Sequence, residues 1–181
     1  MRLVIVSNRL PFSVVEKDGG LELQRTAGGL ASGLSAYIDS IKDKSYIWIG
    51  WPGNTIKSRN EKEVEKMLNE YNAYPVFISE SSVNKFYNGF CNKVIWPLFH
   101  YFPSYVVYDS DYWLHYKKVN EIFCERIMEF IKPGDIVWIH DYHLMLLPKL
   151  LREKMGNNLP IGFFLHIPFP SFEIFRLLPA E

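Results

Sequence analysis

The stretch IVWIHDYHL, residues 136–144, decides the fold, because four large apolar residues run directly into the polar sequence HDYH. A continuous apolar run rich in β-branched and aromatic residues is typical of a strand buried on both faces, as in a parallel sheet. Open parallel sheets bind their ligands beyond the carboxyl ends of the strands. The stretch therefore predicts a buried strand followed directly by candidate binding residues.

Further apolar runs of the same kind recur along the chain, at LVIV (3–6), YIWIG (46–50), YPVFI (74–78) and IGFFL (161–165). Apolar residues at helical spacing lie between these runs, over 28–41, 58–71, 112–131 and from Asp141 to about Met155. Strands that alternate with helices predict an α/β fold, a Rossmann-like doubly wound parallel sheet with helices on both faces.

Several helix boundaries can also be predicted. Ser58 and Glu61 have the spacing of a capping box at the start of the second helix. A Pro-Gly pair at 133–134 ends the third helix, and Pro148 is expected to kink the fourth. The last residues, 171–181, begin another helix and then stop.

Composition excludes several classes of protein. The 181 residues are 48% hydrophobic, enough for one substantial core. Twenty basic residues balance twenty acidic ones, so no broad positive field predicts a nucleic-acid or membrane partner. No apolar run approaches the roughly 20 residues of a membrane-spanning helix. Two widely spaced cysteines without metal-type spacing predict a reducing, cytoplasmic location.

Polar groups follow four of the predicted strands, at 7–9, 51–53, 140–143 and 166–168. These strand ends come from remote parts of the sequence, and a parallel sheet brings them to one edge. Arg9 at that edge has a planar guanidinium that suits a phosphate group. The alternative is a surface arginine paired with a carboxylate.

Gly28 and Gly29 precede the first predicted helix, where free backbone N–H groups favour an anion. A plain turn is the alternative. The full G-x-G-x-x-G fingerprint is missing, so a nicotinamide cofactor is not predicted.

The HDYH sequence has two further interpretations. Its histidines and Asp141 could bind a metal, as in a metal hydrolase, but successive residues leaving a strand point in different directions. We therefore predict no metal site and interpret His140 and His143 as structural histidines with satisfied hydrogen bonds. Asp141 is placed either to accept hydrogen bonds from sugar hydroxyls or to cap the next helix.

Aromatic residues are interleaved with polar ones in FYNGFCNKVIWPLFH, residues 86–100, as expected of a segment with one solvent-exposed face. Tyr87 and Trp96 could therefore stack on the apolar face of a sugar ring, or simply belong to the core.

Five blocks, RLVIVSNRLP, TAGGLASGL, FYNGFCNKVIWPLFHY, VWIHDYHLMLLP and IGFFLHIPFPSFEIFR, closely resemble the N-terminal half of the trehalose-6-phosphate synthase family. The resemblance implies a GT-B glycosyltransferase with two Rossmann-like domains. It implies transfer of glucose from UDP-glucose to glucose 6-phosphate, with retention at the anomeric carbon and with no cofactor or metal.

The resemblance also implies roles for individual residues. Arg9 matches the arginine that binds the acceptor phosphate. Trp51, Tyr87 and Trp96 match residues of the acceptor pocket, and Asp141 matches the acidic residue that hydrogen-bonds the acceptor sugar.

On the donor side, the resemblance places Gly28 and Gly29 near the nucleotide sugar. His166 matches the histidine beside the donor glucose at the reacting centre, where it would support the sugar ring rather than act as a general base. His166 and Asp141 are thus the expected catalytic residues.

We expect residues 1–181 to be an incomplete N-terminal, acceptor-side domain, with a C-terminal nucleotide-sugar domain supplied in cis or in trans. The isolated chain is expected to be inert or nearly so, because the groups that neutralise the diphosphate belong to the second domain. The alternatives are a non-catalytic sugar-phosphate-binding or regulatory subunit and a related glycosyltransferase with another phosphorylated acceptor. A homo-oligomer is compatible with each of these.

Overall fold

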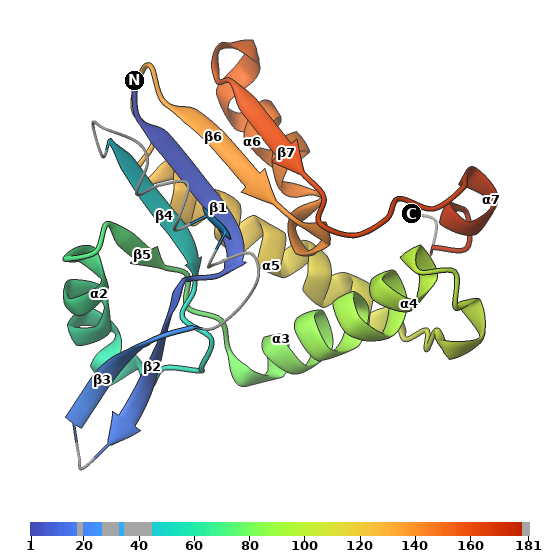
Figure 1. Cartoon of the computed structure of the whole chain (residues 1–181), viewed down its shortest axis with the longest axis horizontal. Coiled ribbons are helices and arrows are strands. Elements are labelled where there is room, and N and C mark those ends of the chain that lie inside the picture. Colours follow the sequence, from blue (N-terminus) through green and yellow to red (C-terminus); the bar gives the residue numbers. More distant parts are fainter. Residues whose placement is uncertain (18–19, 27–32, 35–44, 179–181) are drawn as a thin grey trace.

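The computed structural model describes residues 1–17, 20–26, 33–34 and 45–178. A five-stranded parallel sheet runs through the described part of the chain in the order β5-β4-β1-β6-β7 (Figure 1). Its strands are β1 (Leu3–Arg9), β4 (Tyr46–Trp51), β5 (Ala73–Pro75), β6 (Ile136–His140) and β7 (Ile161–Phe164). The predicted α/β parallel sheet is confirmed.

The sheet differs from the prediction in two places. β5 covers only the first part of the predicted run at 74–78. β7 lies at the sheet edge, and Phe163 and Phe164 are exposed rather than buried on both faces. A separate antiparallel hairpin of β2 (Phe12–Lys17) and β3 (Gly20–Arg25) was not predicted.

The helices connect the strands and extend along the sheet. The α-helices are α2 (Glu61–Asn69), α3 (Glu80–Lys85), α4 (Trp96–Phe99), α5 (Ser110–Met128), α6 (Leu147–Met155) and α7 (Phe172–Phe175). A π-helix, η2 (Phe86–Ile95), joins α3 to α4. Short 3₁₀ turns are η1 (Ser58–Asn60), η3 (Pro103–Tyr105), η4 (Tyr142–Leu144) and η5 (Gly156–Asn158).

Two predicted helix boundaries are wrong. Ser58 lies inside η1, and α2 begins after Asn60 with no side-chain cap, so no capping box forms. Pro148 does not kink a helix that starts at Asp141; η4 forms first, and Pro148 lies in the first turn of α6. Proline is favoured there, because the first-turn N–H has no partner within the helix. The helix predicted over 28–41 lies outside the described residues except for 33–34.

The sheet is buried on both faces because alternate residues of each central strand enter different clusters. Val4 and Val6 of β1 pack with residues of α5 and α6, whereas Ile5 packs with residues of α2 on the opposite face. Strands with both faces covered in this way appear in the sequence as continuous apolar runs, which is why they could be predicted.

The carboxyl ends of β1, β4, β6 and β7 point toward the segment formed by α3, η2 and α4, which lies across that edge of the sheet (Figure 1). Residues of η2 contact both α5 and η4. The edge predicted to bind a ligand is thus the edge where elements distant in sequence meet. None of the helices described is long and apolar enough to cross a membrane.

Gly50 allows β4 to approach an irregularity in β1. The β1–β4 register shifts between Val6 and Arg9. A Cβ atom at Gly50 would lie 2.7 Å from the Ser7 carbonyl oxygen and 3.1 Å from the Leu10 nitrogen, both backbone atoms that cannot rotate away. This close contact lies directly beneath Arg9.

We expect Gly50→Ala to lower the free energy of unfolding by about 1–3 kcal/mol, the usual cost of overpacking a rigid site. Gly162→Ala in β7 is the matched control, because its Cβ would meet Trp138 Cδ1 at an ordinary 3.4 Å. Urea unfolding of both variants measures the difference. Equal stability of the two variants would contradict this role of Gly50.

Candidate functional site

Arg9 and Trp51 are register partners at the ends of adjacent strands. The Arg9 guanidinium carbon lies 5.5 Å from the centre of the Trp51 ring, a cation–π distance. The guanidinium also occupies the space that a side chain at Gly53 would need, and Gly53 has a φ of +85° that favours glycine. Arg9 is exposed and takes part in none of the ion pairs of the described residues. Among the described residues, Arg9 therefore does not form the surface ion pair with a carboxylate that was the alternative interpretation.

Buried hydrogen bonds fix the backbone at Arg9. The buried Ser7 hydroxyl donates to the Arg9 carbonyl oxygen over 2.7 Å and accepts from Trp48 Nε1 over 2.7 Å. The Asn8 Oδ1 atom is buried and has no hydrogen-bond partner among the described residues. Strand β1 thus ends in an ordered irregularity with Arg9 at its tip.

Tyr87 reaches this region from η2. Its ring lies 6.0 Å from the Trp51 ring and 5.6 Å from the His143 ring, to which it is nearly parallel at 16°. π-Helical turns are rare overall, and those that occur within α-helices are often found at functional sites. The side chains Asn88, Asn92 and Lys93 are exposed, as expected of one wet face.

Asp141 directly follows β6 and has an unusual backbone conformation, with φ 76° and ψ 166°. Its Oδ1 atom accepts from the Tyr142 N–H over 2.9 Å and from the His166 N–H over 3.3 Å. Burial raises the pKa of this carboxyl group, and the two backbone hydrogen bonds oppose that shift. Asp141 does cap the following turn, but it also joins the end of β6 to the segment after β7.

His140 and His166 form a hydrogen-bonded pair, with 3.0 Å between His140 Nδ1 and His166 Nε2. His140 is 1% exposed, whereas His166 is exposed. Burial, and next the charge of His166, lowers the pKa of His140 to about 4. His140 is therefore neutral near pH 7, and its hydrogen bond holds the exposed His166 ring in place.

His143 lies between two tyrosines. Its ring is stacked 4.0 Å from that of Tyr142 and lies 5.6 Å from that of Tyr87, and its Nδ1 atom is 3.8 Å from Asp141 Oδ2. Burial lowers the pKa of His143 to about 3. Both histidines are buried, but the prediction that their hydrogen bonds are satisfied is wrong for the described residues: His140 Nε2 and both His143 nitrogens have no partner there.

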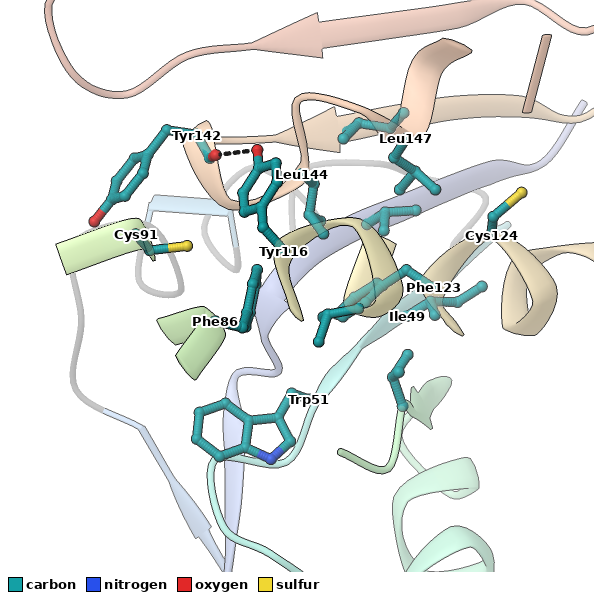
Figure 2. Packing of buried hydrophobic residues seen from close by; sticks show 14 of the residues in the cluster. Ile49, Trp51, Phe86, Cys91, Tyr116, Phe123, Cys124, Tyr142, Leu144 and Leu147 are labelled. Carbon is teal, nitrogen blue, oxygen red and sulfur yellow. Dashed lines mark hydrogen bonds between the residues drawn. The ribbon is translucent and has the colours of Figure 1, made fainter. Parts of the chain in front are cut away.

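Helix α5 holds the backbone of the η4 turn. The Tyr116 hydroxyl donates to the Tyr142 carbonyl oxygen over 2.7 Å (Figure 2) and accepts from the Met145 N–H over 3.1 Å. The Asn120 side chain donates to the His143 carbonyl oxygen over 3.1 Å. Sequence reasoning missed both residues; the available signal is two polar side chains four residues apart on the apolar face of a helix.

Some predicted site residues are not joined to this set. Trp96 is 44% exposed and stacks on His100 at 4.1 Å, its only ring contact among the described residues. Gly28 and Gly29 lie outside the described residues. Within the described ranges, no three His, Cys, Asp or Glu side chains are placed to hold a metal ion.

The contacts form one continuous line across the carboxyl edge of the sheet. It runs from Arg9 through Trp51, Tyr87 and His143 to the Asp141 carboxylate, and from there to His166. One end offers an exposed cation, and the other end offers a carboxylate oxygen and an imidazole. Between them, Trp51 (5% exposed) and His143 (8% exposed) are buried, and Tyr87 is half-buried. Such a set is suited to a molecule with an anionic group and several hydroxyls.

Comparisons with known proteins agree on one family. The sequence profile of Glycosyltransferase family 20 matches residues 1–181. A UDP-forming α,α-trehalose-phosphate synthase of Emericella nidulans is 46% identical over 188 residues, covering 99% of this chain and 36% of the relative.

Solved structures give the same result. A trehalose-6-phosphate protein of E. coli, bound with UDP-2-fluoro glucose, matches with a TM-score of 0.74 and 34% identity over 99% of this chain and 36% of that one. An α,α-trehalose-phosphate synthase (UDP-forming) of Burkholderia xenovorans, in complex with glucose-6-phosphate, matches with a TM-score of 0.72 and 29% identity over 97% and 36%. The chain thus spans little more than a third of the length of these proteins.

We expect stability to fall as the pH is lowered from 6.5 to about 4, because the unfolded chain takes up protons on histidine there while His140 stays neutral in the folded state. For His140 the loss amounts to about 3 kcal/mol at most. His140→Asn cannot titrate at this position and should make the curve less steep over this range, while the buried, neutral His143 keeps part of the slope. Urea unfolding at several pH values measures it, with the range above pH 7 as control. Parallel curves for the two proteins at low pH would refute the assignment.

Proposed function

Because the chain belongs to glycosyltransferase family 20, we propose that it forms the acceptor-binding part of a UDP-forming α,α-trehalose-phosphate synthase. The observation that carries the proposal is the line of contacts between Arg9 and Asp141, which begins at a cation with no ion pair in the described part of the chain. This enzyme transfers glucose from UDP-glucose to glucose 6-phosphate. The relatives solved with UDP-2-fluoro glucose and with glucose-6-phosphate support this choice of substrates.

In the proposed acceptor complex, the Arg9 guanidinium binds the phosphate of glucose 6-phosphate. Its position over Trp51 and against Gly53 orients the planar fork before the ligand arrives. Tyr87 and Trp51 supply the aromatic wall, and Asp141 Oδ2, which accepts no hydrogen bond among the described residues, accepts one from a sugar hydroxyl. Trp96 would join this wall when the sugar is bound.

On the donor side, we assign His166 to the donor glucose, with Gly28 and Gly29 approaching the nucleotide sugar. The 3.0 Å contact with the neutral, buried His140 fixes the His166 ring at the edge of the site. A ring held in this way can support a sugar whose anomeric carbon gains positive charge in the transition state. General-base work is not assigned to it.

The proposed reaction retains the anomeric configuration by front-face attack, in which the acceptor hydroxyl approaches the face that the diphosphate leaves. The bond from the anomeric carbon to the UDP oxygen breaks while the bond to the acceptor oxygen forms, and the proton of the acceptor hydroxyl passes to the departing diphosphate oxygen on the same face. The protein's part is to hold the two sugars in reach of each other and to stabilise the charges that develop. We assign Asp141 and His166 to the place where the two sugars meet, an assignment supported by the hydrogen bond from the His166 backbone N–H to Asp141 Oδ1 over 3.3 Å.

We propose that the 181 residues by themselves bind the acceptor but do not turn over. The diphosphate that leaves needs cationic partners. The chain spans 36% of the Emericella relative, and we assign those partners to the part of the full-length proteins beyond this span. A cytoplasmic location is also proposed, supported by two buried cysteines that are both free thiols.

Arg9→Ala should weaken glucose 6-phosphate binding by at least about tenfold, since a charge-assisted phosphate contact contributes about 1.5–3 kcal/mol. Arg9→Lys keeps the charge but loses the fork, and should give an intermediate affinity. Isothermal titration calorimetry of the 181-residue chain measures both. Arg59→Ala, on the exposed η1 turn, is the control and should bind like the unaltered chain. Unchanged affinity in Arg9→Ala would sink the proposed phosphate site.

Incubation of the 181-residue chain with UDP-glucose and glucose 6-phosphate should release no UDP above background. A coupled assay for UDP measures this, with a full-length family member as positive control. Robust release by the isolated chain would show that the diphosphate is neutralised by residues within it.

A further inference from the structure

His143 is a buried polar residue in the line of contacts, but the proposed mechanism gives it no chemical role. The residue is 8% exposed, and neither ring nitrogen has a hydrogen-bond partner among the described residues. Buried polar atoms are normally paired, because an unpaired one loses its hydration without compensation. Simple packing would be served better by an apolar side chain at this position.

The surroundings of His143 connect two walls of the site. On one side its ring lies parallel to Tyr87 of η2, and on the other its Nδ1 atom faces Asp141 Oδ2 at 3.8 Å. Among the described residues that oxygen is left free, since Oδ1 accepts both backbone hydrogen bonds of the carboxylate. His143 thus faces the Asp141 oxygen that is available to a ligand.

Charge and backbone contacts fix the state of the ring. With its pKa lowered to about 3 by burial, His143 is neutral and carries one N–H. The nearby carboxylate favours the form with the proton on Nδ1. The Asn120 amide holds the His143 carbonyl oxygen over 3.1 Å, so the backbone cannot carry the ring away.

We propose that His143 is a positioning residue for Asp141. Its Nδ1–H aims the free carboxylate oxygen at the acceptor sugar, and its ring sets the distance between Tyr87 and Asp141. The 3.8 Å separation needs to shorten by roughly 1 Å to become a hydrogen bond, and we assign that bond to the ligand-bound state. This inference rests on the proposed function, because it requires Asp141 to bind the sugar.

Two substitutions distinguish the contribution of the Nδ1–H donor from that of the aromatic ring. His143→Phe keeps an aromatic ring against Tyr87 and removes both nitrogens. His143→Asn loses the ring but places an amide nitrogen near the position of Nδ1, so it can still donate to Asp141. If packing alone matters, the phenylalanine variant is the better mimic; if the hydrogen bond matters, the asparagine variant is.

The experiment compares two ligands on the unaltered 181-residue chain and on both variants. Glucose 6-phosphate engages Arg9 and Asp141, whereas inorganic phosphate engages Arg9 alone. Calorimetry gives the ratio of the two dissociation constants, which reports on the sugar contacts. Thermal unfolding of each variant checks that it is folded.

We expect His143→Phe to lose about tenfold in affinity for glucose 6-phosphate with unchanged phosphate binding, and His143→Asn to recover most of the preference for the sugar phosphate. The inference is overturned if the phenylalanine variant keeps the preference, if both ligands weaken together, or if asparagine restores nothing. A variant that does not fold also counts against a positioning role. If the unaltered chain binds glucose 6-phosphate no better than phosphate, the proposed function itself fails, and the inference with it.

Discussion

Burial of β1 on both faces is the constraint from which the site follows. A strand covered on both sides can present polar side chains to a ligand only where it leaves the sheet, and its neighbours β4 and β6 are parallel to it. Their polar residues therefore emerge at the same edge. The strand order also reverses between β1 and β6, which is where open α/β sheets have their binding crevice. Arg9 and Asp141 stand on either side of that reversal.

Asp141 fixes the ends of neighbouring strands relative to one another. A backbone φ of 76° is costly for a residue with a side chain, and it persists only when the surroundings impose it. Here Tyr116 and Asn120 hold the following turn, and the carboxylate holds the segment after β7. One strained residue thus couples two strands and a helix, so the geometry of the site depends on buried contacts well behind it.

The strands, and with them the positions of Arg9, Asp141 and His166, could be predicted from the sequence, because continuous apolar runs of strand length are typical of a buried parallel sheet. The β2–β3 hairpin could not, since its apolar residues pack only when the other face of the sheet is present. The positive φ of Asp141 and the support from Tyr116 were also missed, because neither leaves a periodic signal. The roles that the family resemblance implies for the site residues stay predictions, which the binding experiments test.

The π-helix η2 changes how its own sequence must be read. At about 100° per residue, an α-helix would place Tyr87 and Trp96, nine residues apart, on opposite sides of the cylinder. The wider turn of a π-helix advances each residue by only about 80°, so the same spacing returns nearly to the starting direction. The solvent-accessible positions agree with the wider turn, since Tyr87 is half-buried and Asn88, Asn92, Lys93 and Trp96 are exposed. Removing one residue to restore a regular α-helix would therefore rotate Trp96 relative to Tyr87, so the relative direction of these two side chains depends on the length of the segment.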